Sequence, residues 1–156
     1  MAAMFEGFSF FEEFSHTIDS QRRVAIPADW RVKDSETRFV LLPAREGILY
    51  GIPSRTFHDE IIAKARKMSL ANSRDLRDLA ALGSRAQECI CDKQGRIQIS
   101  QRLMDHAGLR DKVVLVGAIW MIQLWTPEKW EASQSSAGSE FYDVMGRLGD
   151  GAGGQS

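Results

Sequence analysis

The sequence has little that would hold a small secreted or membrane protein together. Its 2 cysteines, Cys89 and Cys91, lie two positions apart, where on one strand they are poorly placed to bridge each other. It has no run of about 18 apolar residues, which a membrane-spanning helix requires. Residues 1–7 lack the basic and long apolar regions of a signal peptide. We therefore expect a soluble, unprocessed protein in a reducing cytoplasm, without a membrane partner.

The sequence also lacks an excess of charge of either sign. It has 20 Lys and Arg against 21 Asp and Glu, which argues against a protein that coats any polyanion. The charge is unevenly distributed, because residues 14–112 sum to +5 whereas residues 1–13 and 113–156 each sum to −3. This distribution permits nucleic-acid binding, although a solvated surface of mixed charge would show the same excess.

The chain contains an internal repeat, which predicts two related structural units. At a shift of 73 residues, four positions of the first motif are identical in the second: Asp19, Gln21, Arg23 and Ile26 match Asp92, Gln94, Arg96 and Ile99. At a shift of 74, a further set matches: Val40, Leu41, Ala44, Ile48 and Pro53 match Val114, Leu115, Ala118, Ile122 and Pro127. Units of roughly 45 residues are near the limit of independent stability, so we expect each copy to need the other.

Each copy has the pattern of a short strand, a helical turn and a hairpin. Alternating apolar residues predict short strands with one buried face, and β-branched runs predict longer strands that are followed by partner strands. The expected strands are 24–26, 39–42 and 48–50 in the first copy and 97–99, 113–116 and 121–125 in the second. Pro27 opens a turn or short helix to Arg31, and a helix over 101–107 ends at Gly108.

Between the copies the apolar spacing becomes helical, which predicts two helices over about 57–68 and 76–82. Ser54 and either Asn72 or Ser73 are the N-cap candidates, and Gly83 is expected to end the second helix. Five basic residues are expected on the solvent side of these helices: Lys64, Arg66, Lys67, Arg74 and Arg77.

After Pro127 we expect a third helix, interrupted at 134–138 and followed by one or two further turns over 141–148. The glycine-rich residues 149–156 have too little apolar surface to offset their ordering entropy, so they are expected to form a mobile tail.

The motif Asp-x-x-Gly-Arg followed by an alternating strand, seen at Asp92 to Arg96, resembles the SpoVT-AbrB type of DNA-binding domain. Two copies in one short chain, with their flanking residues, resemble the MraZ family of bacterial regulators. The flanks are Phe5-x-Gly7, Trp30-Arg31, His106-Ala107-Gly108-Leu109 and Val114-Leu115-Val116-Gly117. The resemblance covers residues 5 to about 131, and the doubled motif makes it specific.

The resemblance implies an α+β, mainly β fold. In it, two repeated SpoVT-AbrB-like β-hairpin units pack as a small β-barrel with pseudo-twofold symmetry, with helices between and after the repeats. The corresponding segments are a first repeat over 5–58, a helical connection over 59–84, a second repeat over 85–132, and a weakly helical, then disordered tail over 133–156.

The resemblance also implies a function and partners. Family members form a homo-oligomeric ring, an octamer or a dodecamer, that binds direct repeats in promoter DNA upstream of the division and cell-wall gene cluster. They repress transcription, including that of their own operon, which places them in the cytoplasm at the nucleoid. Two alternatives stay open: a ring on the same barrel that does not bind DNA, and an antitoxin-like regulator.

The candidate DNA-binding residues are Arg22, Arg23, Lys93, Arg96, Arg31 and Arg102. An arginine next to a tight turn can place its planar donors against a phosphate or a guanine edge, so Arg23 and Arg96 come first. Their alternative role is a structural ion pair with the motif aspartate. Arg22 and Lys93 are expected to neutralise phosphates, or to be ordinary solvated charges.

Asp19 and Asp92 are expected to shape the turns, because a carboxylate repels phosphate but accepts backbone N–H bonds. Gly95 is also expected to shape the second turn, and the corresponding residue of the first turn is Arg22. If this position needs a positive φ, Arg22 is strained by roughly 1–2 kcal/mol. Either the first turn then has a different shape, or the added cation offsets the strain when DNA binds. Ser100 also replaces the proline of the first copy. Both differences predict that the copies do not touch DNA equally. Gln21 and Gln94 could read bases or complete the turns.

No residues form a recognised catalytic constellation, so we expect no enzyme, no cofactor and no small-molecule substrate. Cys89 and Cys91 lack a second ligand pair at finger-like spacing, so strand packing is favoured over metal binding. Residues 149–154 lack the Lys-Ser or Lys-Thr ending of a phosphate loop. The tryptophans are expected to pack in the core or at a subunit interface: Trp30, Trp120, Trp125 and Trp130.

Overall fold

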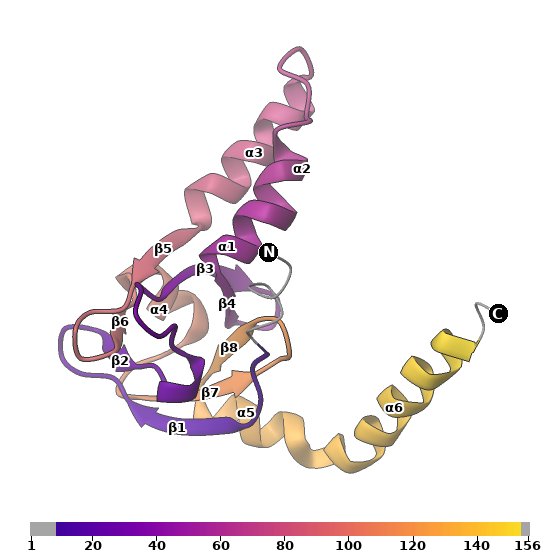
Figure 1. The fold of residues 1–156 in the computed structure, drawn as a ribbon. Coiled ribbons are helices and arrows are strands. Elements are labelled where there is room, and N and C mark those ends of the chain that lie inside the picture. Colours follow the sequence, from indigo (N-terminus) through magenta and orange to yellow (C-terminus); the bar gives the residue numbers. More distant parts are fainter. Residues whose placement is uncertain (1–8, 154–156) are drawn as a thin grey trace. The chain divides into compact units, whose positions relative to one another are not determined.

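A computed structural model describes residues 9–153 of the chain, which form two units, one ending at Thr126 and one beginning at Pro127 (Figure 1). The strands of the first unit are β1 Glu13–Thr17, β2 Arg23–Ala25, β3 Arg38–Ala44, β4 Ile48–Pro53, β5 Gln87–Ile90, β6 Arg96–Gln98, β7 Lys112–Gly117 and β8 Ile122–Trp125. Its helices are the 3₁₀ turn η2 Ala28–Trp30, α1 Ser54–Thr56, the π-helical η3 Phe57–Ile62, α2 Ala63–Ala65, α3 Ser73–Arg85 and α4 Gln101–Ala107.

The eight strands form two antiparallel sheets whose order reflects the repeat. One sheet has six strands in the order β1-β7-β8-β4-β3-β5, and the other is the ribbon of β2 and β6. The repeat matches β1 with β5, β3 with β7, and β4 with β8. If each strand is exchanged with its match, the same strand order is obtained, read from the opposite edge of the sheet. The expected pseudo-twofold α+β fold is therefore confirmed.

The residue pairing shows the same symmetry. In the ribbon, Val24 lies opposite Ile97, its own counterpart at the shift of 73, and the flanking pair Arg23↔Gln98 exchanges with Ala25↔Arg96. Between β4 and β8, Leu49 lies opposite Leu124 and Tyr50 opposite Gln123, which also exchange at the shift of 74. A pseudo-twofold axis thus passes through the ribbon and through the centre of the larger sheet.

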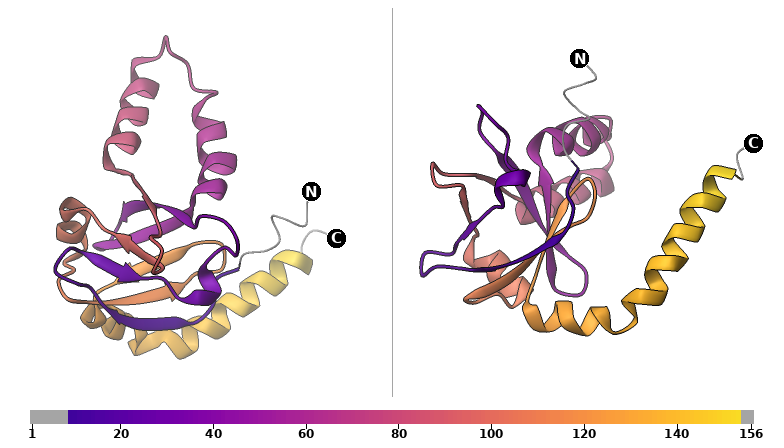
Figure 2. Two further views of the ribbon diagram at one scale, coloured as in Figure 1. Left: turned by 60° about the vertical axis from the view of Figure 1, so that its left-hand side comes forward. Right: turned by 60° about the horizontal axis from the view of Figure 1, so that its bottom comes forward.

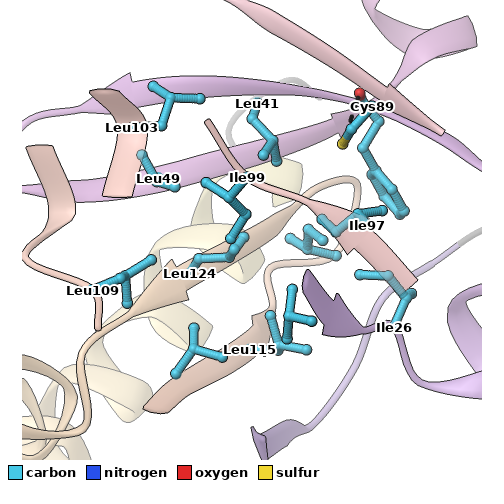
Figure 3. Close-up of a cluster of buried hydrophobic side chains, with 14 of the residues drawn as sticks. Ile26, Leu41, Leu49, Cys89, Ile97, Ile99, Leu103, Leu109, Leu115 and Leu124 are labelled. Atoms are coloured by element: carbon cyan, nitrogen blue, oxygen red, sulfur yellow. Dashed lines mark hydrogen bonds between the residues drawn. The ribbon is translucent and has the colours of Figure 1, made fainter. Parts of the chain in front are cut away.

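Both sheets enclose one apolar core to which each repeat contributes matching residues (Figure 3). Completely buried members include Leu41, Leu49, Ile99, Leu115 and Leu124. Since burial of one such side chain contributes about 1.5–3 kcal/mol, separating the repeats would expose too much apolar surface for either to remain folded. This interdependence was expected from the length of the repeat.

The connection between the repeats forms a helical arm that projects from one end of the sheet (Figure 2). Helical structure is continuous from Ser54 to Ala65, and α3 follows after a short loop. Asn72 caps α3 by accepting N–H bonds from Arg74 and Asp75, as expected. The base of the arm packs on the sheet through Phe57 against Val40 and Ile52.

Two helix boundaries differ from the expectation. Ser54 is the first helical residue and makes no cap bond, because Pro53 occupies the N-cap position. Gly83 lies inside α3, which continues to Arg85 because the N–H of Ala86 still reaches the carbonyl of Leu82 at 3.2 Å. The five basic residues expected on the solvent side of the arm are all exposed.

The second unit consists of α5 Pro127–Ser133, the 3₁₀ turn η4 Gln134–Ser136 and α6 Ala137–Gly153. The interruption after α5 matches the expectation, but α6 is longer than the one or two turns expected. Residues 149–153 belong to α6, whereas a mobile tail was expected there. Each glycine lowers helix stability by about 1 kcal/mol, and this cost does not end the backbone hydrogen bonding of α6 before Gly153. Residues 154–156, and the flank Phe5-x-Gly7, lie outside the described residues. Among residues 9–153, no helix is long and apolar enough to cross a membrane.

Candidate nucleic-acid interface

Each motif folds as a tight turn around its aspartate. In the first turn, Asp19 Oδ1 accepts the backbone N–H groups of Gln21 at 2.9 Å and Arg23 at 2.8 Å. In the second turn, Asp92 Oδ1 accepts those of Gln94 and Arg96, both at 2.9 Å. An aspartate favours such a turn because its carboxylate accepts the backbone N–H of the residue two positions later.

The same aspartates hold the motif arginines. Arg23 Nε donates to Asp19 Oδ2 at 2.8 Å, and Arg96 Nε donates to Asp92 Oδ2 at 3.0 Å. The pKa of each aspartate is lowered, chiefly because its ionised form accepts the backbone N–H of the motif arginine, with the side-chain bond adding to the effect. The two carboxylates are therefore ionised at neutral pH, and the structural ion pair considered for Arg23 and Arg96 is present in both turns.

The β2–β6 ribbon brings the two turns together. Backbone bonds tie each turn to the opposite repeat: Ile26 N–H donates to Gly95 O at 2.8 Å, and Ile99 N–H donates to Arg22 O at 2.9 Å. Because Val24 and Ile97 are completely buried, the alternating neighbours Arg23 and Arg96 point to the opposite, outward face.

Arg23 and Arg96 lie on this face as diagonal neighbours across two strands, typically about 7–8 Å apart at the backbone. Arg96 Nη1 also lies 3.9 Å from Asp19 Oδ2, so the two motifs share one charged cluster. The side chains of Arg23 and Arg96 remain 31% and 29% exposed. Within the described residues, no hydrogen bond or ion pair joins Nη1 or Nη2 of Arg23, or Nη2 of Arg96, to another group, so these nitrogens keep donors for a ligand.

The position before each motif arginine requires a left-handed backbone. Gly95 has φ +79° and Arg22 has φ +64°, so the first turn keeps the shape of the second. For Arg22 this costs roughly 1–2 kcal/mol. Its Nε donates to Ile99 O at 2.8 Å, and a hydrogen bond from a charged group contributes about 1.5–3 kcal/mol, which is enough to offset the strain.

The other three candidate cations are in different environments. Lys93 is exposed at the tip of the second turn, and Arg102 is exposed on α4. Arg31 instead lies against the second turn, where a Cβ on Gly95 would overlap its Nη1 and stand 2.7 Å from its Cζ. The two turns thus carry Arg22, Arg23, Lys93 and Arg96, whereas Arg31 lies against the second turn and Arg102 lies on α4.

One polar residue of the ribbon was not expected from the sequence. Gln98 faces outward opposite Arg23, and its Nε2 donates to Gln21 O at 2.8 Å. The repeat contained a signal for this residue, because the shift of 73 places Gln98 on Ala25, a position that shares the outward face with Arg23. The side chains of Gln21 and Gln94 are exposed at the turns.

Cys89 lies in β5, and Cys91 directly precedes Asp92 of the second turn. Burial raises the pKa of the Cys89 thiol to about 12 and that of the Cys91 thiol to about 11, so neither is a thiolate at neutral pH. The His106 ring bonds to Ala44 O at 2.8 Å. In the part of the chain that the structure describes, no three His, Cys, Asp or Glu residues are grouped to hold a metal ion.

Comparisons with known proteins agree on one family. The family model described as "MraZ protein, putative antitoxin-like" matches residues 9–79 and 82–145. The transcriptional regulator MraZ of Limosilactobacillus reuteri (strain DSM 20016) is 35% identical over 133 residues, which cover 85% of this chain and 92% of that protein. Proteins of the same name from Ligilactobacillus salivarius (strain UCC118) and Natranaerobius thermophilus are 32% and 33% identical, each match covering 90% of this chain and 97% of the relative.

Proposed function

This chain belongs to the MraZ family, and from this membership and the paired turns we propose that it is a transcriptional repressor that binds double-stranded DNA. Its site is the outward face of the β2–β6 ribbon with the two turns, and its targets are direct repeats in the promoter of its own operon and of the division and cell-wall gene cluster. The repressor acts by occupying DNA, in the cytoplasm at the nucleoid, without catalysis.

One observation carries the proposal: two guanidinium groups from two repeats lie side by side on one outward face. Each is fixed through Nε to the carboxylate of its own turn, so its Nη groups keep donors for a ligand. A guanidinium held in this way loses little side-chain entropy when it meets a phosphate or a guanine edge. Arg22 and Lys93 add two further positive charges at the turns.

The charge of this surface explains why one protomer is not enough. The four cations Arg22, Arg23, Lys93 and Arg96 are offset by Asp19 and Asp92, so the two turns together carry only +2. Few phosphate contacts per protomer give weak binding, whereas several linked protomers gain affinity through effective concentration. A homo-oligomeric ring, an octamer or a dodecamer, that engages direct repeats fits this requirement.

An exposed apolar surface supports assembly. Phe11, Ile119 and Trp120 are each more than half exposed, and the backbone bridge between Phe10 and Ile119 places them near one another. A cluster of large apolar side chains on a protein surface is typical of an interaction site. We propose that this cluster contributes to the contact between protomers, and multi-angle light scattering of Trp120→Ser should then give a smaller particle than the unaltered protein.

A second candidate function is favoured by the ion pairs themselves. If Asp19 and Asp92 neutralise the arginines fully, the ring would serve as a protein-interaction platform without binding DNA. The two functions predict different results with DNA from upstream of the gene. A platform does not bind this DNA, whereas a repressor binds it with a log affinity that falls linearly with log salt concentration, because counterions are released.

The decisive experiment is a salt titration of DNA binding by the unaltered protein, Arg23→Ala, Arg96→Ala and Arg77→Ala. Loss of one guanidinium contact should weaken binding by about 1–3 kcal/mol and reduce the salt slope by about one for each protomer engaged. Arg77 is an exposed arginine on α3 and serves as the matched control, so its variant should bind normally. Unchanged binding by both motif variants would exclude this readout.

A further inference from the structure

The second turn is in contact with a side chain from the first repeat. Arg31 follows the buried Trp30 at the end of η2, and its side chain runs along the backbone of Gly95. A Cβ on Gly95 would overlap Arg31 Nη1 and would lie 2.7 Å from Cζ and 3.1 Å from Cδ. Arg31 therefore occupies the space that a side chain at position 95 would need.

This contact has no counterpart in the other direction. At the shift of 73, Arg31 corresponds to Met104, and Gly95 corresponds to Arg22. The first turn is instead linked to the second repeat by its own side chain, through Arg22 Nε and Ile99 O. The two arginines that contact the backbone of the second repeat, Arg22 and Arg31, thus both belong to the first repeat.

The surroundings of Arg31 indicate packing instead of outward display. Its Nε is buried and has no hydrogen-bond partner within the described residues, so this nitrogen is not available to a ligand in solution. Its positive charge acts on Cys91, the residue that leads into the second turn, where it lowers a thiol pKa that burial raises. Arg31 is thus close to both ends of the turn, at Cys91 and at Gly95.

We propose that Arg31 is a positioning residue for the second turn, and not itself a DNA contact. Its side chain holds the backbone from Asp92 to Arg96 in the conformation that presents Lys93 and Arg96 outward. DNA binding by the second repeat then depends on a residue of the first. The link to DNA rests on the proposed function, whereas the bracing of the turn is a property of the free protein.

The first arm of the test needs no DNA. Amide hydrogen exchange, followed by NMR in Arg31→Ala, should become at least tenfold faster at Gln94 and Gly95, with Gln21 and Arg22 in the first turn unchanged. Arg102→Ala is the matched control, because Arg102 is an exposed arginine that should leave both turns unaffected. Unchanged exchange at Gln94 and Gly95 in a folded Arg31→Ala would overturn the proposal.

Further variants separate shape from charge. Arg31→Lys keeps the charge without the planar group, so it should not restore slow exchange, whereas Arg31→Met fills the space and should restore it in part. Gly95→Ala displaces the Arg31 side chain, so its effect on exchange should be smaller in the Arg31→Ala background than in the unaltered protein. The Arg31→Lys and Arg31→Met variants remain available if Arg31→Ala does not fold, and exchange at Gln94 and Gly95 as slow in Arg31→Lys as in the unaltered protein would contradict the bracing.

The DNA arm distinguishes bracing from direct contact. A positioning residue should lower affinity severalfold while the salt slope stays the same, whereas loss of a phosphate contact should reduce the slope by about one for each protomer engaged. A reduced slope with unchanged amide exchange would make Arg31 a DNA contact. If the unaltered protein does not bind DNA, the proposed function fails, but the exchange result still decides whether Arg31 braces the turn.

Discussion

The two turns of the ribbon follow the same backbone path and are held in it by different side chains. Both have an aspartate that accepts two backbone N–H bonds, and both have a left-handed residue before the arginine. In the first turn that residue is Arg22, which bonds to Ile99 O, whereas in the second it is Gly95, which contacts Arg31. The aspartate thus bonds to the same backbone positions in both turns, whereas the guanidinium that links each turn to the other repeat differs between them.

Their electrostatic surroundings also differ. Asp19 lies near two arginines, Arg23 at 2.8 Å and Arg96 at 3.9 Å, whereas the ion pair of Asp92 is with Arg96 alone among the described residues. The first turn also carries two adjacent arginines, where the second carries Lys93 and Arg96 separated by two residues. Two turns with one backbone therefore present different patterns of charge to a ligand.

The largest effect on this comparison is expected from Gly95→Ala. An alanine at φ +79° costs roughly 1–2 kcal/mol, and its Cβ also displaces the Arg31 side chain. Chemical unfolding should show a decrease of at least that size in the free energy of unfolding. Gly83→Ala is the control, because Gly83 lies within α3 with nothing near its Cβ position, so this variant should be slightly more stable. A Gly95→Ala protein as stable as the unaltered one would show that the second turn tolerates a side chain as the first turn does.

The next effect concerns the aspartates and pH. The pKa of Asp19 and of Asp92 is lowered in the folded state from an ordinary value of 3.8, so their stabilisation is complete above that value and is lost as the pH falls through the lower folded pKa. Thermal unfolding of Asp19→Asn and Asp92→Asn should give a lower Tm than the unaltered protein at about pH 6, with the difference shrinking below about pH 4. Asp19→Asn should be the more damaging, because Asp19 also faces Arg96. A difference independent of pH would mean that the carboxylate charge is unimportant.

The smallest effect is expected from Arg22→Gly, which makes the first turn like the second. Glycine relieves strain of roughly 1–2 kcal/mol at φ +64° but removes the bond from Nε to Ile99 O, so the two changes nearly cancel in the free energy of unfolding. Arg22→Ala keeps the strain and loses the bond, so it should be less stable than Arg22→Gly in the same unfolding measurement. The reverse order would show that the hydrogen bond contributes little.

Much of the fold could be predicted from the repeat and the apolar pattern. The repeat anticipated that each copy needs the other, and the alternation at Val24 and Ile97 predicted strands with one buried face. The pseudo-twofold arrangement of the halves was expected from the family resemblance. The strand β1 was missed, since its side chains alternate only between exposed and half-buried and its pairing with β7 depends on a distant segment. The helix start at Ser54 was misplaced because Pro53 takes the N-cap position, and the helix end at Gly83 was misplaced because backbone hydrogen bonding continues to Ala86.

The candidate site divides in the same way. The sequence by itself determined the turns, because Asp19 and Asp92 bond to N–H groups only two and four residues away. It also determined the outward position of the motif arginines, because successive residues of a strand face opposite sides and their neighbours are buried. Only the tertiary structure decided what crosses between the repeats: Arg22 reaches a carbonyl 77 residues away, and Arg31 packs on Gly95. Such contacts depend on how two separate turns meet in space, and no spacing along the chain encodes that distance.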